Sequence, residues 1–224
     1  MYKYLCIIPI HFMLKKISQI LKYWSPTKST YHRYFTEEKS SGNISHPYNA
    51  ITSLIYIYIF IVFMHDESGH KQTVSIINLI LGIVSYLFHA TEISIIEKVD
   101  ITFVYANKLA FLLLQLNVSL FVFNMLVMLF LSSMLCNLYI NKDSLKQYVG
   151  CSHRNYFLVP LTFGILLTLK GSMTPYLVFL VAYVFKFSDI FLSYYDISIT
   201  QMFQGTAIYH LVTGCAMTMK LLEI

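Results

Sequence analysis

Long apolar segments, separated by short polar stretches, dominate the chain from residue 48 onward. A helix needs about twenty mostly apolar residues to cross the roughly 30 Å hydrocarbon core of a membrane. Seven segments approach that length: about 48–64, 73–91, 100–116, 118–140, 156–170, 173–194 and 201–221. Backbone polar groups must be satisfied internally in lipid, so spanning segments fold as helices or closed barrels. The pattern predicts an all-α polytopic membrane protein with a bundle of seven transmembrane helices.

Residues 1–47 precede the first apolar segment and are predicted to form a region of their own, before a membrane domain over 48–224. The beginning of this region is apolar but is interrupted by Pro9, Lys15 and Lys16. That pattern favours an interfacial amphipathic helix, with a signal anchor or an additional span as alternatives. The rest of the region is polar and rich in turn-forming residues, which is typical of a structured loop.

Composition supports a membrane protein and narrows the classes of partner. Hydrophobic residues make up 57% of the chain and charged residues 12%, with a mean hydropathy of +0.61. Soluble domains carry about 25% charged residues. The formal net charge of +5 is spread over loops and the N-terminal region, which indicates contact with a membrane surface and not with nucleic acid. We therefore expect the lipid bilayer and a membrane lipid as partners, and no nucleic acid.

A hydroxyl, an imidazole and a carboxylate lie near the boundary between the second and third apolar segments. Ser85 and His89 are four residues apart, so a helix places them on one face, and Asp100 follows shortly afterwards. If the spans alternate in direction, Thr206 and His210 at the start of the last span reach the same leaflet. Polar and ionisable groups at membrane depth are costly and mark a functional site by default. Counting helices therefore predicts that these five side chains converge.

Hydrolysis by metal-activated water suits these side chains. Imidazole is a preferred zinc ligand, and a catalytic zinc lowers the pKa of its bound water to about 7. A carboxylate such as Asp100 accepts the proton of that water, and the Ser85 hydroxyl donates to a developing oxyanion. The alternative is that His89 is a hydrogen-bonded packing residue. The other histidines fall in loops or at helix ends, where solvated side chains are expected: His11, His32, His46, His65, His70 and His153.

These motifs resemble those of the alkaline ceramidases. Ser85-x-x-x-His89 followed by Asp100 is similar to the family motif of spans two and three, and Gly205-Thr-Ala-Ile-Tyr-His210-Leu-Val-Thr-Gly214 is similar to that of span seven. Two further segments resemble the ceramidases: Phe187-Ser-Asp189-Ile-Phe191, and Pro26-Thr-Lys-Ser-Thr30 with Tyr48-Asn49 downstream. The wider superfamily of seven-span metal-dependent hydrolases also includes lipases that remodel GPI anchors and the adiponectin-receptor-like proteins.

The resemblance implies a multi-pass enzyme of the endoplasmic reticulum or Golgi membrane. It implies hydrolysis of the ceramide amide to a sphingoid base and a fatty acid by zinc-activated water. The implied zinc ligands are His89 and His210, the implied oxyanion-side hydroxyl is Ser85, and the residue that positions or deprotonates the water is Asp100. Asp189 either supports the site from a neighbouring helix or pairs with Lys186, which lies three residues before it.

Departures from the family pattern leave alternatives open. Thr206 stands where the family has a third histidine ligand, and threonine is a poor zinc ligand. The first alternative is therefore a catalytically silent relative that binds a lipid. The local sequence Glu97-Lys98-x-Asp100 is closer to the GPI-remodelling lipases, which makes an ester-cleaving enzyme the second alternative. The acidic residues with which the family binds calcium are missing from the N-terminal loop, so calcium is not expected there.

The distribution of positive charge leaves the membrane orientation open. Lys and Arg are far more numerous in the loops and the N-terminal region on one side of the predicted bundle than on the opposite side. The positive-inside rule places the richer side, which is also the side of the candidate site, in the cytosol. The resemblance instead implies that the N-terminus faces the lumen.

Overall fold

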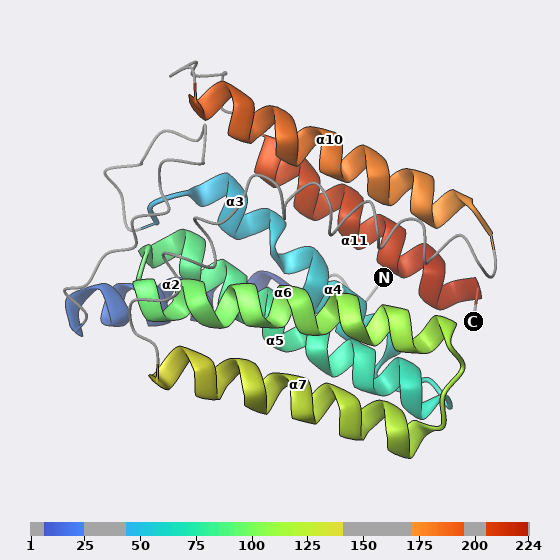
Figure 1. The fold of residues 1–224 in the computed structure, drawn as a ribbon. Helices are drawn as coiled ribbons and strands as arrows, with labels where there is room; N and C mark the ends of the chain where they lie inside the picture. The colour runs from blue at the N-terminus through green and yellow to red at the C-terminus, as the bar shows by residue number, and fades with distance from the viewer. Residues whose placement is uncertain (1–6, 25–43, 141–171, 195–204, 224) are drawn as a thin grey trace.

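The computed structural model describes residues 7–24, 44–140, 172–194 and 205–223, and each regular element within these ranges is an α-helix. In chain order these are α2 (Ile7–Trp24), α3 (Pro47–Thr52), α4 (Leu54–Phe63), α5 (Gly69–Thr91), α6 (Ser94–Gln115), α7 (Leu120–Ile140), α10 (Thr174–Tyr194) and α11 (Gly205–Glu223) (Figure 1). The predicted all-α class is confirmed for the part of the chain that the structure describes.

The predicted apolar segments coincide with helices wherever the structure describes them. The second, third and fourth segments are α5, α6 and α7, and the last two are α10 and α11. The fifth, 156–170, lies outside the described residues. α6 and α7 are separated at Asn117, whose φ of 50° is a left-handed conformation that asparagine tolerates. Among the described residues, one helix, α5, is long and apolar enough to cross a membrane by length and composition.

The first predicted span, 48–64, consists of two helices, α3 and α4, which are divided at Ser53, although this residue keeps a right-handed helical conformation (φ −62°, ψ −20°). The hydroxyl of Thr52 donates to the carbonyl of Tyr48 at 2.8 Å, and that of Ser53 donates to the carbonyl of Asn49 at 2.8 Å. Such bonds to the residue four positions earlier compete with the backbone ladder and bend helices. The break leaves the Ser53 side chain fully buried inside the bundle.

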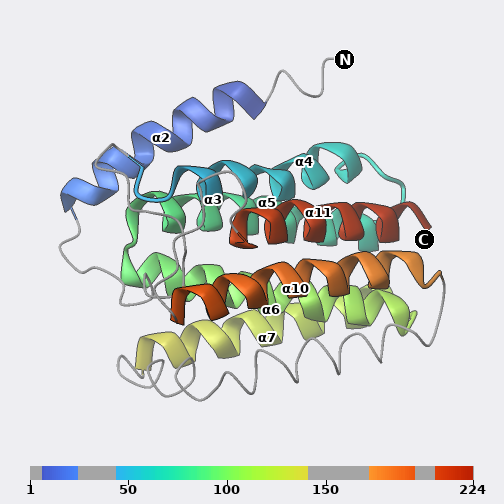
Figure 2. The ribbon, with the colours of Figure 1, turned by 90° about the horizontal axis from the view of Figure 1, so that it is seen from above.

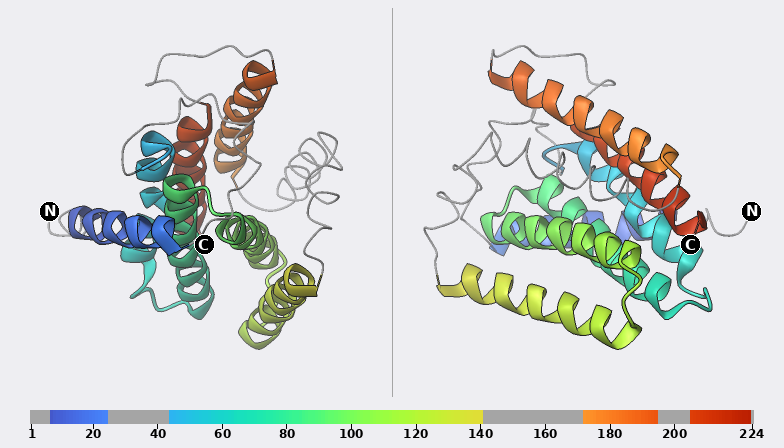
Figure 3. Two further views of the ribbon diagram at one scale, coloured as in Figure 1. Left: turned by 90° about the vertical axis from the view of Figure 1, so that its left-hand side faces the viewer. Right: turned by 45° about the vertical axis from the view of Figure 1, so that its right-hand side comes forward.

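Helices that are consecutive in the chain pack against each other from α4 through α7, and α10 packs against α11 as a second pair. α11 also contacts α3 and α4, which joins this second pair to the rest of the bundle beside the break at Ser53. Figures 2 and 3 show the arrangement from above and from two further directions, with α2 against α5 on the outside. The start of α11 thereby lies at the end of the bundle where α5 ends and α6 begins.

A buried pair of amides holds α5 and α6 in register within the apolar core. Asn78 Nδ2 donates to Asn107 Oδ1 at 3.2 Å, and Asn107 Nδ2 donates to Asn78 Oδ1 at 3.1 Å. Both side chains are fully buried among apolar residues of the core, which include Leu81 and Phe103. A shift of one helix along the other would break both bonds between the amides and leave their buried oxygens without these donors, which costs more than the bonds themselves contribute.

Large apolar side chains are exposed along the outer helices. Phe121 on α7 is 77% exposed and Val184 on α10 is 66% exposed. Met128 and Leu129 add to this apolar surface on α7. Extended apolar surface of this kind is typical of contact with a membrane or with another protein.

A helix is present within the N-terminal region, where the sequence predicts one. One side of α2 packs on α4 and α5 through the buried Leu14 and the partly buried Ile10. His11 of the same helix lies 3.0 Å from the hydroxyl of Tyr86 on α5 through its Nδ1 atom. Phe12 on the outer side is 60% exposed. The helix is confirmed, and its position at a membrane surface stays a prediction.

Gly82 lies where α5 packs closely against Ser53 and Ile57, so a larger residue there should destabilise the bundle. An added Cβ atom would lie 2.6 Å from Ile57 Cγ1, 3.0 Å from the backbone nitrogen of Ile57 and 3.3 Å from the carbonyl oxygen of Ser53. Backbone atoms cannot turn aside as the end of a side chain can. We expect Gly82→Ala to lower the free energy of unfolding by about 1–3 kcal/mol, measured by thermal unfolding in detergent.

Gly69→Ala is the matched control for that experiment. Its added Cβ would meet only the side chain of Leu120, whose methyl groups can move to another rotamer. We expect this variant to unfold near the temperature of the wild type. Equal destabilisation by the two alanines would contradict the close approach of α5 to the break.

Candidate functional site

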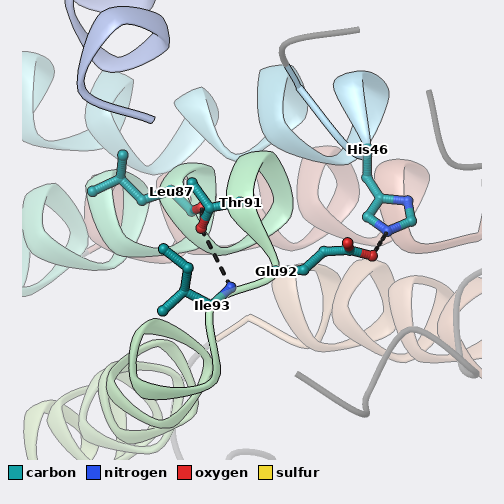
Figure 4. Close-up of polar contacts among 5 residues, drawn as sticks. All are labelled: His46, Leu87, Thr91, Glu92 and Ile93. Atoms are coloured by element: carbon teal, nitrogen blue, oxygen red, sulfur yellow. Dashed lines mark hydrogen bonds and ion pairs between the residues drawn. The ribbon is translucent and has the colours of Figure 1, made fainter. Parts of the chain in front are cut away.

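The site begins at the sharp turn between α5 and α6. α5 ends at Thr91, and Glu92 adopts a left-handed conformation, φ 58°, while its backbone N–H donates to the carbonyl of Phe88 at 2.7 Å. Thr91 Oγ1 donates to the carbonyl of Leu87 at 2.6 Å and accepts from the backbone N–H of Ile93 at 3.4 Å (Figure 4). These bonds reverse the chain between the two helices, so the last turns of α5 lie beside the first turns of α6.

The segment before α3 folds onto this turn. His46 Nε2 lies 3.0 Å from Glu92 Oε1, and the two side chains are 3% and 5% exposed (Figure 4). The backbone N–H groups of Ser45 and His46 donate to the carbonyls of Ala90 and His89, each at 3.0 Å. The sequence-based prediction of a solvated loop side chain at His46 is wrong, because these bonds fix the segment against the end of α5. No local pattern in the sequence signals that contact.

Two substitutions of Glu92 distinguish the effect of its backbone conformation on stability from the effect of its side chain. A left-handed conformation costs a non-glycine residue roughly 1–2 kcal/mol, and glycine adopts it without that cost. Both Glu92→Ala and Glu92→Gly remove the contact with His46, but only alanine is strained in the left-handed conformation of this position. We expect the alanine variant to be less stable than the glycine variant by about 1 kcal/mol in thermal unfolding. A less stable glycine variant would show that residue 92 is not left-handed in the folded protein.

The structure brings the two imidazoles predicted as metal ligands together. His89 lies in the last turn of α5, and His210 lies near the start of α11. Their ring centroids are 5.2 Å apart with an interplanar angle of 56°, and both side chains are buried. The alternation of spans predicts this meeting, although the two residues belong to distant parts of the chain.

The break between α3 and α4 orients His210. Its Nδ1 atom lies 3.3 Å from both Thr52 Oγ1 and Ser53 Oγ. The Thr52 hydroxyl donates to the carbonyl of Tyr48 at 2.8 Å, and the Ser53 hydroxyl shares its proton between the carbonyl of Asn49 at 2.8 Å and Ser85 Oγ at 3.2 Å. Because neither proton is directed at the ring, each oxygen is left to accept a bond from the imidazole, which also hydrogen-bonds the backbone of Asn49. This assigns the ring proton to Nδ1 and the lone pair to Nε2. A histidine fixed in this way presents a defined nitrogen to a metal, a water or a proton.

Asp100 is connected to the same network through hydroxyl groups. Its carboxylate accepts a hydrogen bond from the Ser85 side chain. Ser85 Oγ lies 3.2 Å from Ser53 Oγ, which also contacts His210. All four side chains are buried, and Asp100 Oδ1 has no hydrogen-bond partner within the described residues. A buried carboxylate oxygen in that position can accept a proton from a water or a substrate.

A lysine ammonium contacts Thr206, the residue at the position where the resemblance expects a third ligand. Lys186 Nζ, on α10, donates to Thr206 Oγ1 at 2.9 Å. Thr206 is 1% exposed and lies one turn before His210 on α11. The positive charge of Lys186 interacts electrostatically with His89, His210 and Asp100. The site therefore contains a cation of the protein's own.

Asp189 lies in α10 as predicted, but its side chain is outside the described part of the structure. Its predicted roles, supporting the site or pairing with Lys186, therefore stay predictions. Sequence reasoning did not single out Thr52, Ser53 or the approach of Lys186 to Thr206. A lysine within an apolar span and a missing third histidine are the two signals from which that approach could have been inferred.

The donors present do not fit a catalytic zinc centre with three protein ligands. Such centres combine three His, Cys, Asp or Glu side chains with a water. His89 and His210 offer two imidazoles, whereas Thr206 offers a hydroxyl that accepts from an ammonium group. Within the described residues, no three His, Cys, Asp or Glu side chains are placed to hold a metal ion together. Zinc held by His89 and His210 stays a prediction from the resemblance.

The prediction that no calcium is bound concerns the N-terminal loop, which lies mostly outside the described residues.

Comparisons of the chain with protein-family models, with curated proteins and with solved structures find no match. The resemblance to the alkaline ceramidases therefore stays a prediction from the motifs. What the structure adds is that Ser85, Asp100 and His210 belong to one buried network, with the His89 ring beside it.

Proposed function

We propose that this chain is a ceramidase-like hydrolase of the endoplasmic reticulum or Golgi membrane, which crosses the bilayer several times and cleaves the amide of a ceramide-like lipid. The products are a sphingoid base and a fatty acid. The observation that carries the proposal is the continuous buried network that connects Asp100, Ser85, Ser53 and His210, with the His89 ring beside it. Polar networks inside an apolar bundle are costly and are typical of functional sites.

The exposed apolar side chains of α7 and α10 support the membrane part of the proposal. Phe121 and Val184 face outward, while the ionisable groups of the site point into the bundle. In a soluble protein this distribution would place a large apolar surface in water. In a bilayer the same distribution places lipid tails against the outer helices.

The chemistry requires a base, a fixed imidazole and a group that stabilises the oxyanion. Asp100 accepts a proton as water attacks the amide carbon, and the carbonyl becomes a tetrahedral oxyanion. The C–N bond then breaks, and the leaving amine takes up the proton that Asp100 accepted. His210, fixed by Thr52 and Ser53, orients the attacking water through its Nε2 lone pair. In this structure the Ser85 hydroxyl donates to Asp100, which holds the base in position.

The proposal is tested by product analysis. Purified protein in lipid nanodiscs is incubated with ceramide, and release of sphingoid base and fatty acid is followed by mass spectrometry. We expect equimolar release of both products. Release of fatty acid from an ester lipid, with ceramide untouched, would contradict the proposal and favour the GPI-remodelling type of enzyme.

A second candidate function is a catalytically silent relative that binds the same lipid. Thr206 favours this candidate, because it stands at the position at which the resemblance to the alkaline ceramidases implies a histidine ligand. Saturable binding of ceramide to the purified protein, with no product after long incubation, would support it over the hydrolase.

A further inference from the structure

The ammonium group of Lys186 lies within the candidate site, where it donates to Thr206 Oγ1. Its ammonium group enters the site from α10, the helix that packs against α11 (Figure 2). The acceptor, Thr206 Oγ1, lies at the third position of the predicted ligand set. A histidine at position 206 would place an imidazole where the ammonium now donates. The threonine and the lysine are therefore complementary: a short hydroxyl acceptor makes room for a long cationic donor.

We propose that the Lys186 ammonium takes the place of the metal ion and stabilises the oxyanion formed on the substrate carbonyl. The chemical step in this inference rests on the proposed function. The replacement of the metal ion rests instead on the side chains present, which are His89, His210 and a Thr206 hydroxyl that accepts from an ammonium group. As water adds to the amide carbon, the carbonyl oxygen gains negative charge and accepts a hydrogen bond from Lys186 Nζ. The proton of the water goes to Asp100 and then to the leaving amine, so the lysine stays protonated throughout.

The surrounding charges suit a cation at this position. The Asp100 carboxylate interacts with Lys186 electrostatically, so the ammonium is balanced by an opposite charge within the same site. The two nearby imidazoles, His89 and His210, also lie within the electrostatic reach of the lysine. A zinc ion between these imidazoles would be repelled by the ammonium group, which weakens any two-histidine site further. Ammonium groups are among the donors that stabilise developing oxyanions in enzymes.

The test measures zinc content and hydrolysis in the same set of variants. Wild type, Lys186→Met, Thr206→His and the double variant are purified in nanodiscs, dialysed against excess zinc and then buffer, and subjected to elemental analysis. We expect the wild type to carry well below one zinc ion per chain and to keep its hydrolysis in a chelator. The double variant, which would present three histidines and no ammonium, should bind about one zinc ion per chain. Thr206→His alone should bind less than the double variant, because the ammonium remains.

Hydrolysis gives the second readout. Lys186→Met should reduce ceramide hydrolysis by roughly 10²-fold, which is the cost of removing one oxyanion donor. Lys186→Arg keeps the charge and should retain more activity than the methionine variant. Thermal unfolding of both variants checks that they are folded. Methionine and arginine variants with equal activity would overturn the role of the charge.

The outcomes separate this inference from the proposed function. A wild type with about one zinc ion per chain, lost in His210→Ala, would overturn the inference and leave ceramide hydrolysis standing. Equal zinc binding by Thr206→His and the double variant would also overturn it. Absence of hydrolysis in every variant, together with the expected zinc contents, would overturn the proposed hydrolase and the oxyanion role while retaining the replacement of the metal by the lysine.

Discussion

Replacing Asp100 by asparagine should reduce ceramide hydrolysis by about 10²–10⁴-fold, because the site then lacks its proton acceptor. The carboxylate is buried beside Ser85, and one of its oxygens has no hydrogen-bond partner within the described residues. Asparagine has nearly the same shape and still accepts from the Ser85 hydroxyl, so the packing of α5 against α6 should survive. Steady-state hydrolysis of ceramide by the purified variant, beside its thermal unfolding, measures the two effects separately.

Asp66→Asn is the matched control for that substitution. Asp66 lies between α4 and α5, where it accepts from the backbone N–H of Ser68 at 2.9 Å, at the end of α5 remote from the site. It undergoes the same chemical change and should leave hydrolysis near the wild-type rate. If Asp100→Asn hydrolyses ceramide as fast as Asp66→Asn, Asp100 is not the base.

His210→Ala should also cause a large loss of activity, roughly 10²-fold, because it removes the imidazole that orients the water. The substitution also leaves the Thr52 and Ser53 hydroxyls without the imidazole they contact at 3.3 Å. The rate of ceramide hydrolysis should fall, and the products should remain the sphingoid base and the fatty acid. The measurement is the rate at saturating ceramide, compared with the apparent affinity for the lipid.

Removal of the Thr52 and Ser53 hydroxyls should reduce hydrolysis less than removal of the His210 imidazole. Thr52→Val together with Ser53→Ala removes both hydroxyl acceptors beside Nδ1, while the imidazole and its hydrogen bond with the backbone of Asn49 remain. Loss of a group that orients a functional histidine costs 10–100-fold in related situations, so we expect about tenfold here. A double variant as impaired as His210→Ala would show that the hydroxyls act in the chemistry directly. An unimpaired double variant would contradict the orienting role of the two hydroxyls.

Apolar periodicity predicted most of the described fold, because spans of this length and composition have few alternatives to a helix. α5, α6, α7, α10 and α11 appear where the pattern places them. The break at Ser53 was missed because Thr52 and Ser53 look like ordinary polar interruptions of an apolar run. Only the two hydroxyl bonds to the preceding turn, at 2.8 Å each, reveal that they divide the helix.

Some of the residues at the site were predicted from the order and direction of the helices. Alternating spans bring His89 and His210 to one end of the bundle, and the structure places their rings 5.2 Å apart. The contacts of His46 and Lys186 depend on how the segment before α3 and the helix α10 pack, and no spacing in the sequence encodes that packing. The i,i+3 spacing pointed instead to a pair between Lys186 and Asp189, whose side chain lies outside the described residues.

The most direct test of the account is hydrolysis of ceramide in water enriched in heavy oxygen, with the protein in nanodiscs. Cleavage by water attack predicts a fatty acid that carries one oxygen from the solvent, released together with an equal amount of sphingoid base and lost in Asp100→Asn. Folded wild-type protein that releases neither product above the level of Asp100→Asn would contradict a hydrolase site in this bundle.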